Sequence, residues 1–164
     1  MVPPDPEIFA RAEQVGERLR QRGWSVAVAE SCTGGLLGAA LTDVPGSSRY
    51  FLGGVIAYAD RVKVEQLAVP PSGLRTHGAV SAETAAAMAS GVRQLLRADI
   101  GVSITGVAGP GAEEEKPAGL TFIGVAAPQP TTLRYHWTGD RWANRRQSVL
   151  AALDLLARAL EEKP

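Results

Sequence analysis

The chain has 164 residues, of which 45% are hydrophobic and 21% are charged, as in a globular protein of one ordinary domain. Lysine plus arginine equals aspartate plus glutamate at 17 each, which argues against a nucleic-acid binder that works by neutralising phosphates. The single cysteine, Cys32, excludes an internal disulfide framework and a zinc site built on cysteines.

We expect no signal peptide at the beginning of the chain. The first six residues are Met-Val-Pro-Pro-Asp-Pro, which lack the basic and apolar segments of a signal peptide. We expect residues 1–5 to form a loose lead-in to the first helix. No apolar run approaches the roughly 20 residues that a membrane span needs. We therefore expect a cytoplasmic protein with no membrane partner.

Apolar spacing and turn residues predict helices that alternate with strands. The expected helices run through 9–22, 36–41, 61–67, 82–97 and 140–161, the fourth of them capped by Ser81. The expected strands are 24–29, 53–58, 99–104, 120–126 and 133–137. Pro70 to Gly73 is expected to break the chain and to leave His77 in a loop, and Trp142 is expected to start the apolar stripe of the last helix.

This alternation implies a layered α/β fold. Strands 120–126 and 133–137 are adjacent and can pair as a hairpin, so we expect a mixed, mostly parallel sheet. In such sheets, ligands bind beyond the carboxyl ends of the strands. Two glycine-rich turns, at Gly34 and at Gly106 to Gly111, follow strand ends and are therefore candidate parts of a site.

The segment Glu30-Ser-Cys-Thr-Gly-Gly35 lies where a buried strand passes into a helix. The N–H groups of a first helical turn have no partner within the helix and can hold an oxyanion or a phosphate. Gly34 and Gly35 remove side chains that would block a close approach. Ser31 is thus the candidate reactive residue; the alternative is that Ser31 or Thr33 only caps the helix.

A serine nucleophile needs a base. No Ser-His-Asp pattern stands out around His77 or His136, whereas Lys63 follows the second strand and can point back toward the same edge of the sheet. A lysine near its ordinary pKa of about 10.4 is almost wholly charged at pH 7, so burial or a nearby cation would have to lower the pKa. The alternatives are that Lys63 is a solvated helix residue, and that Cys32 is either the nucleophile or a small buried residue.

The loop from Thr105 to Gly111 resembles a phosphate cradle, although its spacing matches neither a dinucleotide fingerprint nor a P-loop, and a plain turn is the alternative. Glu113 to Glu115 is most simply a solvated loop. Arg141 and Arg145 stand four residues apart and share one face at the start of the last helix. Two cations there oppose the helix dipole, which indicates either an anionic ligand or a salt bridge.

Taken together, these segments resemble the CinA C-terminal domain family, whose characterised members are nicotinamide-nucleotide amidases (PncC). The resemblance covers roughly residues 9 to 160 and rests on several stretches that occur in the family's order. They are Ala29 to Gly35, Gly53 to Tyr58 with Lys63, His77 to Ser81, Thr105 to Gly111 with Lys116 to Gly119, and Gly139 to Arg141 with Arg145.

The resemblance implies one three-layer α/β/α amidase domain over 1–164, in its stand-alone form and as a homodimer. It implies hydrolysis of nicotinamide mononucleotide to nicotinic acid mononucleotide and ammonia, with Ser31 as nucleophile and Lys63 as base and with no metal or cofactor. Tyr58 and Thr105 match positions that help form the family's site. We expect the N–H groups of Thr33, Gly34 and Gly35 to hold the oxyanion, and Arg141, Arg145 and the backbone of Gly106, Gly109 and Gly111 to hold the phosphate.

Two departures from the family pattern stand near these residues. Ala59-Asp60 replaces the familiar Ser-Asn before Lys63, and the loop between Pro110 and Lys116 is one residue shorter than usual. The alternative function, from another class, is a non-catalytic nucleotide-binding or regulatory module. That alternative predicts nucleotide binding without turnover.

Overall fold

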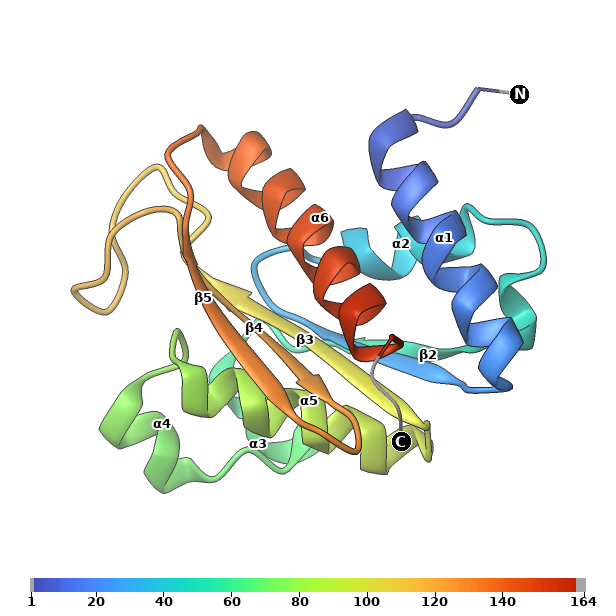
Figure 1. Cartoon of the computed structure of the whole chain (residues 1–164). Coiled ribbons are helices and arrows are strands. Elements are labelled where there is room, and N and C mark those ends of the chain that lie inside the picture. Colours follow the sequence, from blue (N-terminus) through green and yellow to red (C-terminus); the bar gives the residue numbers. More distant parts are fainter. Residues whose placement is uncertain (1, 162–164) are drawn as a thin grey trace.

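The computed structural model of the chain describes residues 2–161, which form a three-layer α/β/α fold (Figure 1). Within these residues the helices are α1 (Pro6–Arg22), α2 (Leu36–Thr42), α3 (Asp60–Leu67), α4 (Pro71–His77), α5 (Ala82–Leu96), α6 (Arg141–Ala159) and the short 3-10 helix η1 (Ser47–Arg49). The strands are β1 (Val26–Glu30), β2 (Phe51–Ile56), β3 (Ile100–Gly106), β4 (Leu120–Ala126) and β5 (Thr131–His136). Among the described helices, none has both the length and the apolar character needed to span a bilayer.

The strands of residues 2–161 form a mixed sheet in the order β2-β1-β3-β4-β5. β1 pairs in parallel with β2 and β3, whereas β4 is antiparallel to both β3 and β5. In this part of the chain, β4 therefore runs against the other four strands, as the predicted hairpin requires. The carboxyl ends of β1, β2 and β3 meet at one edge of the sheet; Ser31 and Lys63 follow β1 and β2 there, and Thr105 and Gly106 end β3.

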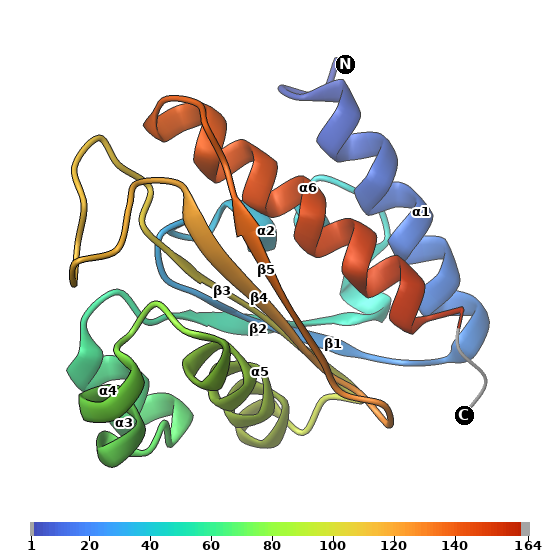
Figure 2. The same ribbon diagram turned by 60° about the vertical axis from the view of Figure 1, so that its left-hand side comes forward.

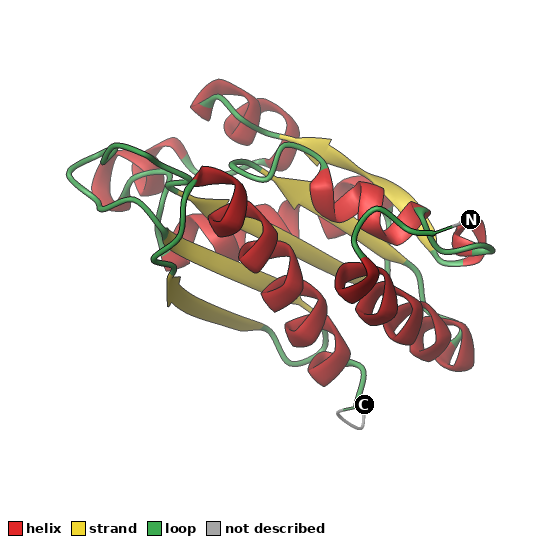
Figure 3. Ribbon diagram, turned by 90° about the horizontal axis from the view of Figure 1, so that it is seen from above, coloured by secondary structure: helices red, strands yellow, loops and turns green. Residues whose placement is uncertain are grey.

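Two groups of helices cover the two faces of the sheet (Figures 2 and 3). α1, α2 and α6 contact one another over one face, while α3 and α4 pack against α5 over the other. Val26 and Val28 of β1 belong to the core on the first face, and Ala27 and Ala29 to the core on the second. This alternation is expected of a strand that is buried on both faces.

Small residues on the second face allow α5 to lie close to the sheet. A Cβ added at Gly124 would lie 2.7 Å from the backbone oxygen of Ala85 in α5. The hydroxyl of Ser103 on β3 donates to the same oxygen at 2.6 Å. These contacts fix the position of α5, and with it the position of the segment 78–81 that leads into the helix.

The predicted strands and the other predicted helices are confirmed, with shifted ends, but three expectations are wrong. Pro71 begins helix α4 instead of breaking the chain, because proline suits the first position of a helix, and His77 ends this helix. Trp142 is 72% exposed, so it does not start the apolar stripe of α6. Asp5 is not loose, since it caps α1 and its Oδ2 accepts from Arg146 at 2.6 Å; Met1 lies outside the described residues.

Candidate active site

The turn that carries Ser31 connects β1 to α2 and is shaped by backbone hydrogen bonds. The amide of Ser31 donates to the carbonyl of Ile104 on β3 at 2.9 Å, and the amide of Gly34 donates back to the carbonyl of Ser31 at 3.0 Å. Gly34 and Gly35 adopt left-handed φ values of 59° and 105°, where a side chain would bring strain. The glycine pair therefore lets the chain reverse directly behind Ser31.

A buried carboxylate, Glu30, holds this turn and the beginning of α2. Its side chain is 1% exposed and accepts the hydroxyl of Thr33 at 2.7 Å and the amides of Leu37 and Gly38 at 2.9 Å each. These donors replace the water that the carboxylate loses on burial. The amides of Leu37 and Gly38 are thus bonded to the chain's own anion, and the amide of Gly34, one of the three predicted oxyanion donors, is bonded to the carbonyl of Ser31.

Lys63, in the first turn of α3, reaches across to Ser31. Its Nζ lies 3.2 Å from Oγ of Ser31, 2.8 Å from the carbonyl oxygen of Ala57 and 3.0 Å from that of Tyr58. The side chain is 1% exposed. The two carbonyls take two N–H groups, so the third direction of the amine points at Ser31. In neutral Lys63 that direction holds the lone pair, which can accept the Ser31 proton.

The surroundings of Lys63 shift its protonation toward the neutral form. Burial lowers the pKa of Lys63, while the carboxylates of Asp60 and Glu114 act in the opposite sense, and burial prevails. Cys32 borders the same cavity, but burial raises the pKa of its thiol to about 12, which keeps it protonated at neutral pH. These shifts favour Ser31 over Cys32 as a nucleophile.

The first turns of α6 connect the Ser31 turn to the second glycine-rich loop. Arg145 donates to the carbonyl of Thr33 at 3.0 Å. Asn144, only 3% exposed, donates its side-chain amide to the carbonyl of Ala108 at 3.0 Å. One helix thereby sets the spacing between the loops that follow β1 and β3.

Arg141 lines the cavity and contacts two of the loops around it. Its guanidinium donates to the carbonyl of Gly109 and, at 3.2 Å, to the hydroxyl of Tyr58, which follows β2 and is 60% exposed. Arg141 therefore brings a fixed positive charge to the border of the cavity that holds Ser31 and Lys63.

The segment 78–81 forms another wall. The hydroxyl of Thr105 donates to the carbonyl of Ala79 at 2.8 Å. Glu114 accepts the amides of Ala79 at 3.0 Å and Val80 at 3.3 Å, so it forms part of this wall instead of lying in a fully solvated loop as expected. The acidic loop consequently places carboxylate charge beside the cavity.

The structure brings six predicted site residues to one cavity: Ser31, Tyr58, Lys63, Thr105, Gly106 and Arg141. At Gly106, an added Cβ would lie 2.7 Å from the hydroxyl of Thr121, so glycine is required by the close approach of β4. The other predicted residues do not border the cavity in the described part of the chain: Thr33, Gly34, Gly35, Gly109, Gly111 and Arg145.

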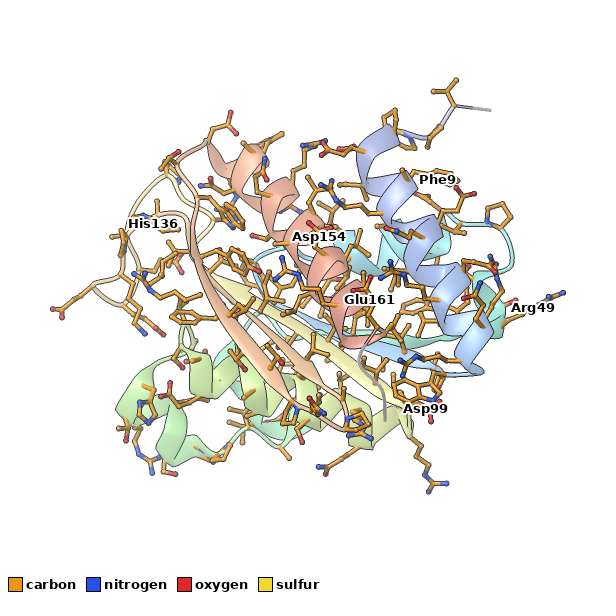
Figure 4. The ribbon with its side chains drawn as sticks, viewed as in Figure 1. Phe9, Arg49, Asp99, His136, Asp154 and Glu161 are labelled. Carbon is orange, nitrogen blue, oxygen red and sulfur yellow. The ribbon has the colours of Figure 1, made fainter. Side chains whose placement is uncertain are left out.

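Neither histidine borders the cavity within residues 2–161. His77 lies at the surface, with its Nδ1 3.7 Å from the carboxylate of Glu83. His136 is exposed on β5 (Figure 4). The geometry therefore gives Ser31 a lysine neighbour and no histidine neighbour.

Four residues of the site carried no predicted role: Glu30, Asp60, Glu114 and Asn144. A signal existed for Glu30, because an acid that directly follows an apolar strand and precedes Thr33 by three positions suits a buried cap. Asp60 was noted in the sequence only because it replaces the familiar Asn of the family pattern before Lys63. The contacts of Glu114 and Asn144 join distant loops, so spacing along the chain does not reveal them.

Comparison with known proteins identifies relatives of this chain. A family model described as the CinA C-terminal domain matches residues 9–160. A putative competence-damage inducible protein of Halothermothrix orenii is 51% identical over 152 residues, which cover 91% of this chain and 37% of that protein. A CinA-like protein of Thermosynechococcus vestitus is 53% identical over 156 residues, covering 92% and 37%. The chain thus spans a little over a third of the length of these curated relatives.

Solved structures show the same fold over nearly the whole length of both chains. A CinA superfamily protein from Klebsiella pneumoniae has a TM-score of 0.91 and 35% identity, covering 94% of this chain and 98% of that one. The competence/damage inducible protein CihA from Agrobacterium tumefaciens has a TM-score of 0.91 and 36% identity, covering 99% and 100%.

Proposed function

Because the chain belongs to the CinA C-terminal domain family, we propose that it is a nicotinamide-nucleotide amidase, which hydrolyses nicotinamide mononucleotide to nicotinic acid mononucleotide and ammonia. The observation that carries this proposal is the 3.2 Å contact between Nζ of Lys63 and Oγ of Ser31 at the border of a cavity. The identity of the proposed substrate comes from the resemblance of the sequence to such amidases.

In the proposed reaction, neutral Lys63 accepts the proton of Ser31 while Oγ attacks the carboxamide carbon. Lys63 then gives this proton to the departing nitrogen, and ammonia leaves. A water molecule, deprotonated by Lys63, hydrolyses the acyl-enzyme and releases the carboxylic acid. The carbonyls of Ala57 and Tyr58 support these transfers, because they hold the amine with its third direction toward Ser31.

The tetrahedral intermediate needs a donor for its oxyanion. The residue after the nucleophile supplies such an amide in other serine hydrolases, and here Cys32 follows Ser31 and borders the cavity. We therefore assign this role to the backbone N–H of Cys32. One donor of this kind contributes about 3 kcal/mol to the transition state.

The remaining parts of the substrate carry opposite charges. The guanidinium of Arg141, which lines the cavity, suits the phosphate, because its planar fork matches phosphate oxygens. The exposed ring of Tyr58 suits the cationic pyridinium. Arg145 stays out of this assignment, since it contacts the carbonyl of Thr33.

The test is ammonia release from nicotinamide mononucleotide by the wild type and by Ser31→Ala and Lys63→Met. Both variants should lose at least a thousandfold in kcat, while circular dichroism shows them folded and Cys32→Ala stays active. Wild-type turnover in either variant would overturn the dyad. Tight nucleotide binding by a wild type that releases no ammonia would favour the regulatory module.

A further inference from the structure

Asp60 is a solvent-exposed carboxylate that forms an ion pair with the buried Lys63. It is the first residue of α3, and its Oδ1 lies 3.7 Å from Nζ of Lys63. The Lys63 side chain is 1% exposed, whereas the Asp60 side chain is 61% exposed and borders the cavity that contains Ser31. A carboxylate that is paired with the base therefore lines the cavity.

Two other charged groups around Lys63, Glu114 and Arg141, have partners of their own. Glu114 is held by the amides of Ala79 and Val80, and Arg141 by Gly109 and Tyr58. The Cys32 thiol is protonated at neutral pH, because burial raises its pKa to about 12. Glu113 also borders the cavity. Asp60 is thus the carboxylate that forms an ion pair with Lys63 among the described residues.

Two cations would compete for this carboxylate. A protonated Lys63 and a cationic ring in one small cavity repel each other, and a carboxylate that pairs with one of them is less available to the other. The cavity relieves the conflict if the amine gives up its proton when the ring arrives. Neutral Lys63 is also the form that can accept the Ser31 proton.

We propose that Asp60 determines specificity for carboxamides on a cationic ring: it pairs with the Lys63 ammonium in the free protein and with the ring in the complex. One N–H bond of Lys63 breaks as the substrate binds, and the proton passes to water, so total charge and atoms balance. This inference rests on the proposed amidase function. In this proposal, the positive charge of the substrate ring causes Lys63 to lose its proton and so to become the neutral base.

The first test compares two nucleotides that share the carboxamide, ribose and phosphate. Calorimetry on Ser31→Ala should show that nicotinamide mononucleotide binds at least tenfold more tightly than its 1,4-dihydro form, which has a neutral ring. Asp60→Asn in the same background should remove most of this preference. Glu65→Gln is the matched control, because Glu65 also lies on α3 but pairs with Arg61 away from the cavity. An unchanged preference in Asp60→Asn would overturn the proposal.

The second test follows the proton. Binding of nicotinamide mononucleotide to Ser31→Ala, measured in buffers of different ionisation enthalpy, should release up to one proton, and the dihydro form should release none. In the active protein, Asp60→Asn should move the acid limb of kcat/KM to lower pH, because the ammonium loses its partner. A merely structural Asp60 would leave this limb in place, and that result would overturn the inference.

The two proposals fail in different ways. If the wild type releases no ammonia from nicotinamide mononucleotide, the amidase function itself is wrong. If the wild type is active but Asp60→Asn keeps both its ring preference and its pH profile, only the role of Asp60 is wrong.

Discussion

Arg145 donates a hydrogen bond to the carbonyl of Thr33 at 3.0 Å, although 112 positions separate the two residues along the chain. Thr33 in turn donates its hydroxyl to Glu30 at 2.7 Å. The turn of Ser31 is therefore held from one side by a buried acid and from the other by the last helix. Arg141, one helical turn earlier, instead borders the cavity. Two arginines that look equivalent in the sequence thus have different surroundings.

This difference predicts a separation in kinetic effects. Arg145→Gln should lower kcat about tenfold with little change in KM, because it loosens the turn that aims Ser31; this corresponds to about 1.4 kcal/mol. Arg141→Gln should raise KM for nicotinamide mononucleotide and have little effect on the phosphate-free riboside. Steady-state kinetics on both substrates checks this. Equal KM effects from both variants would show that the arginines share the phosphate.

Glu30→Gln should lower the free energy of unfolding by about 2 kcal/mol, because an amide group would face an N–H donor at the start of α2. Urea unfolding monitored by circular dichroism measures this loss. The control is Glu65→Gln, a surface substitution that we expect to leave the unfolding midpoint unchanged. A Glu30→Gln protein as stable as the wild type would mean that the three hydrogen bonds of Glu30 carry little net stability.

Much of the fold was predictable because its signals are local. Ser81 caps α5 through the amide of Thr84, as its position in the sequence indicated, and α1 ends at Arg22, the predicted end, before Gly23 in a left-handed conformation. α4 was missed because two prolines and a glycine were interpreted as a break, although Pro71 at the first position favours a helix. Trp142 matched the spacing of the stripe, but spacing does not show whether a partner covers the first turn of the helix.

The site was predictable only in part, for a related reason. Ser31 and Lys63 follow β1 and β2, and Thr105 lies at the end of β3. The carboxyl ends of these strands meet, so the topology of the fold implies that the three residues lie close together. The partners of Arg145 and Glu114 depend on how loops meet across the sheet edge. Glu114 also adopts a left-handed φ of 53°, a conformation that its residue type does not suggest.

Cys32 should be inert in the folded protein despite its position beside Ser31. Burial raises the pKa of its thiol to about 12, so a reagent that attacks thiolates finds almost none at pH 8. Labelling with iodoacetamide should be at least a hundredfold slower in buffer than in urea, and Cys32→Ala should keep kcat within about threefold. Rapid labelling that also abolishes activity would restore the thiol as a candidate nucleophile.

Lys63 should destabilise the folded protein near neutral pH, and Lys63→Met should reveal this cost. Burial lowers the pKa of Lys63 from its usual 10.5, against the weaker opposing influence of Asp60 and Glu114. Between the folded and the unfolded pKa, the unfolded chain binds more protons than the folded chain, so the contribution of Lys63 to stability rises with pH. Below the folded pKa both states are protonated, and the folded state bears the full cost of the buried charge.

Lys63→Met should therefore raise the urea midpoint at pH 7, and the gain should shrink as the pH approaches 10.5. The same proton also controls activity, so kcat/KM of the wild type should change over the same pH range. Below pH 10.5, kcat/KM should rise as the pH rises, while the stability gain from Lys63→Met declines. Urea titrations and pH profiles on matched samples check this agreement. A gain that is constant with pH would show that Lys63 has the same pKa in both states, and the amine would then lack the shift that a base at this site needs.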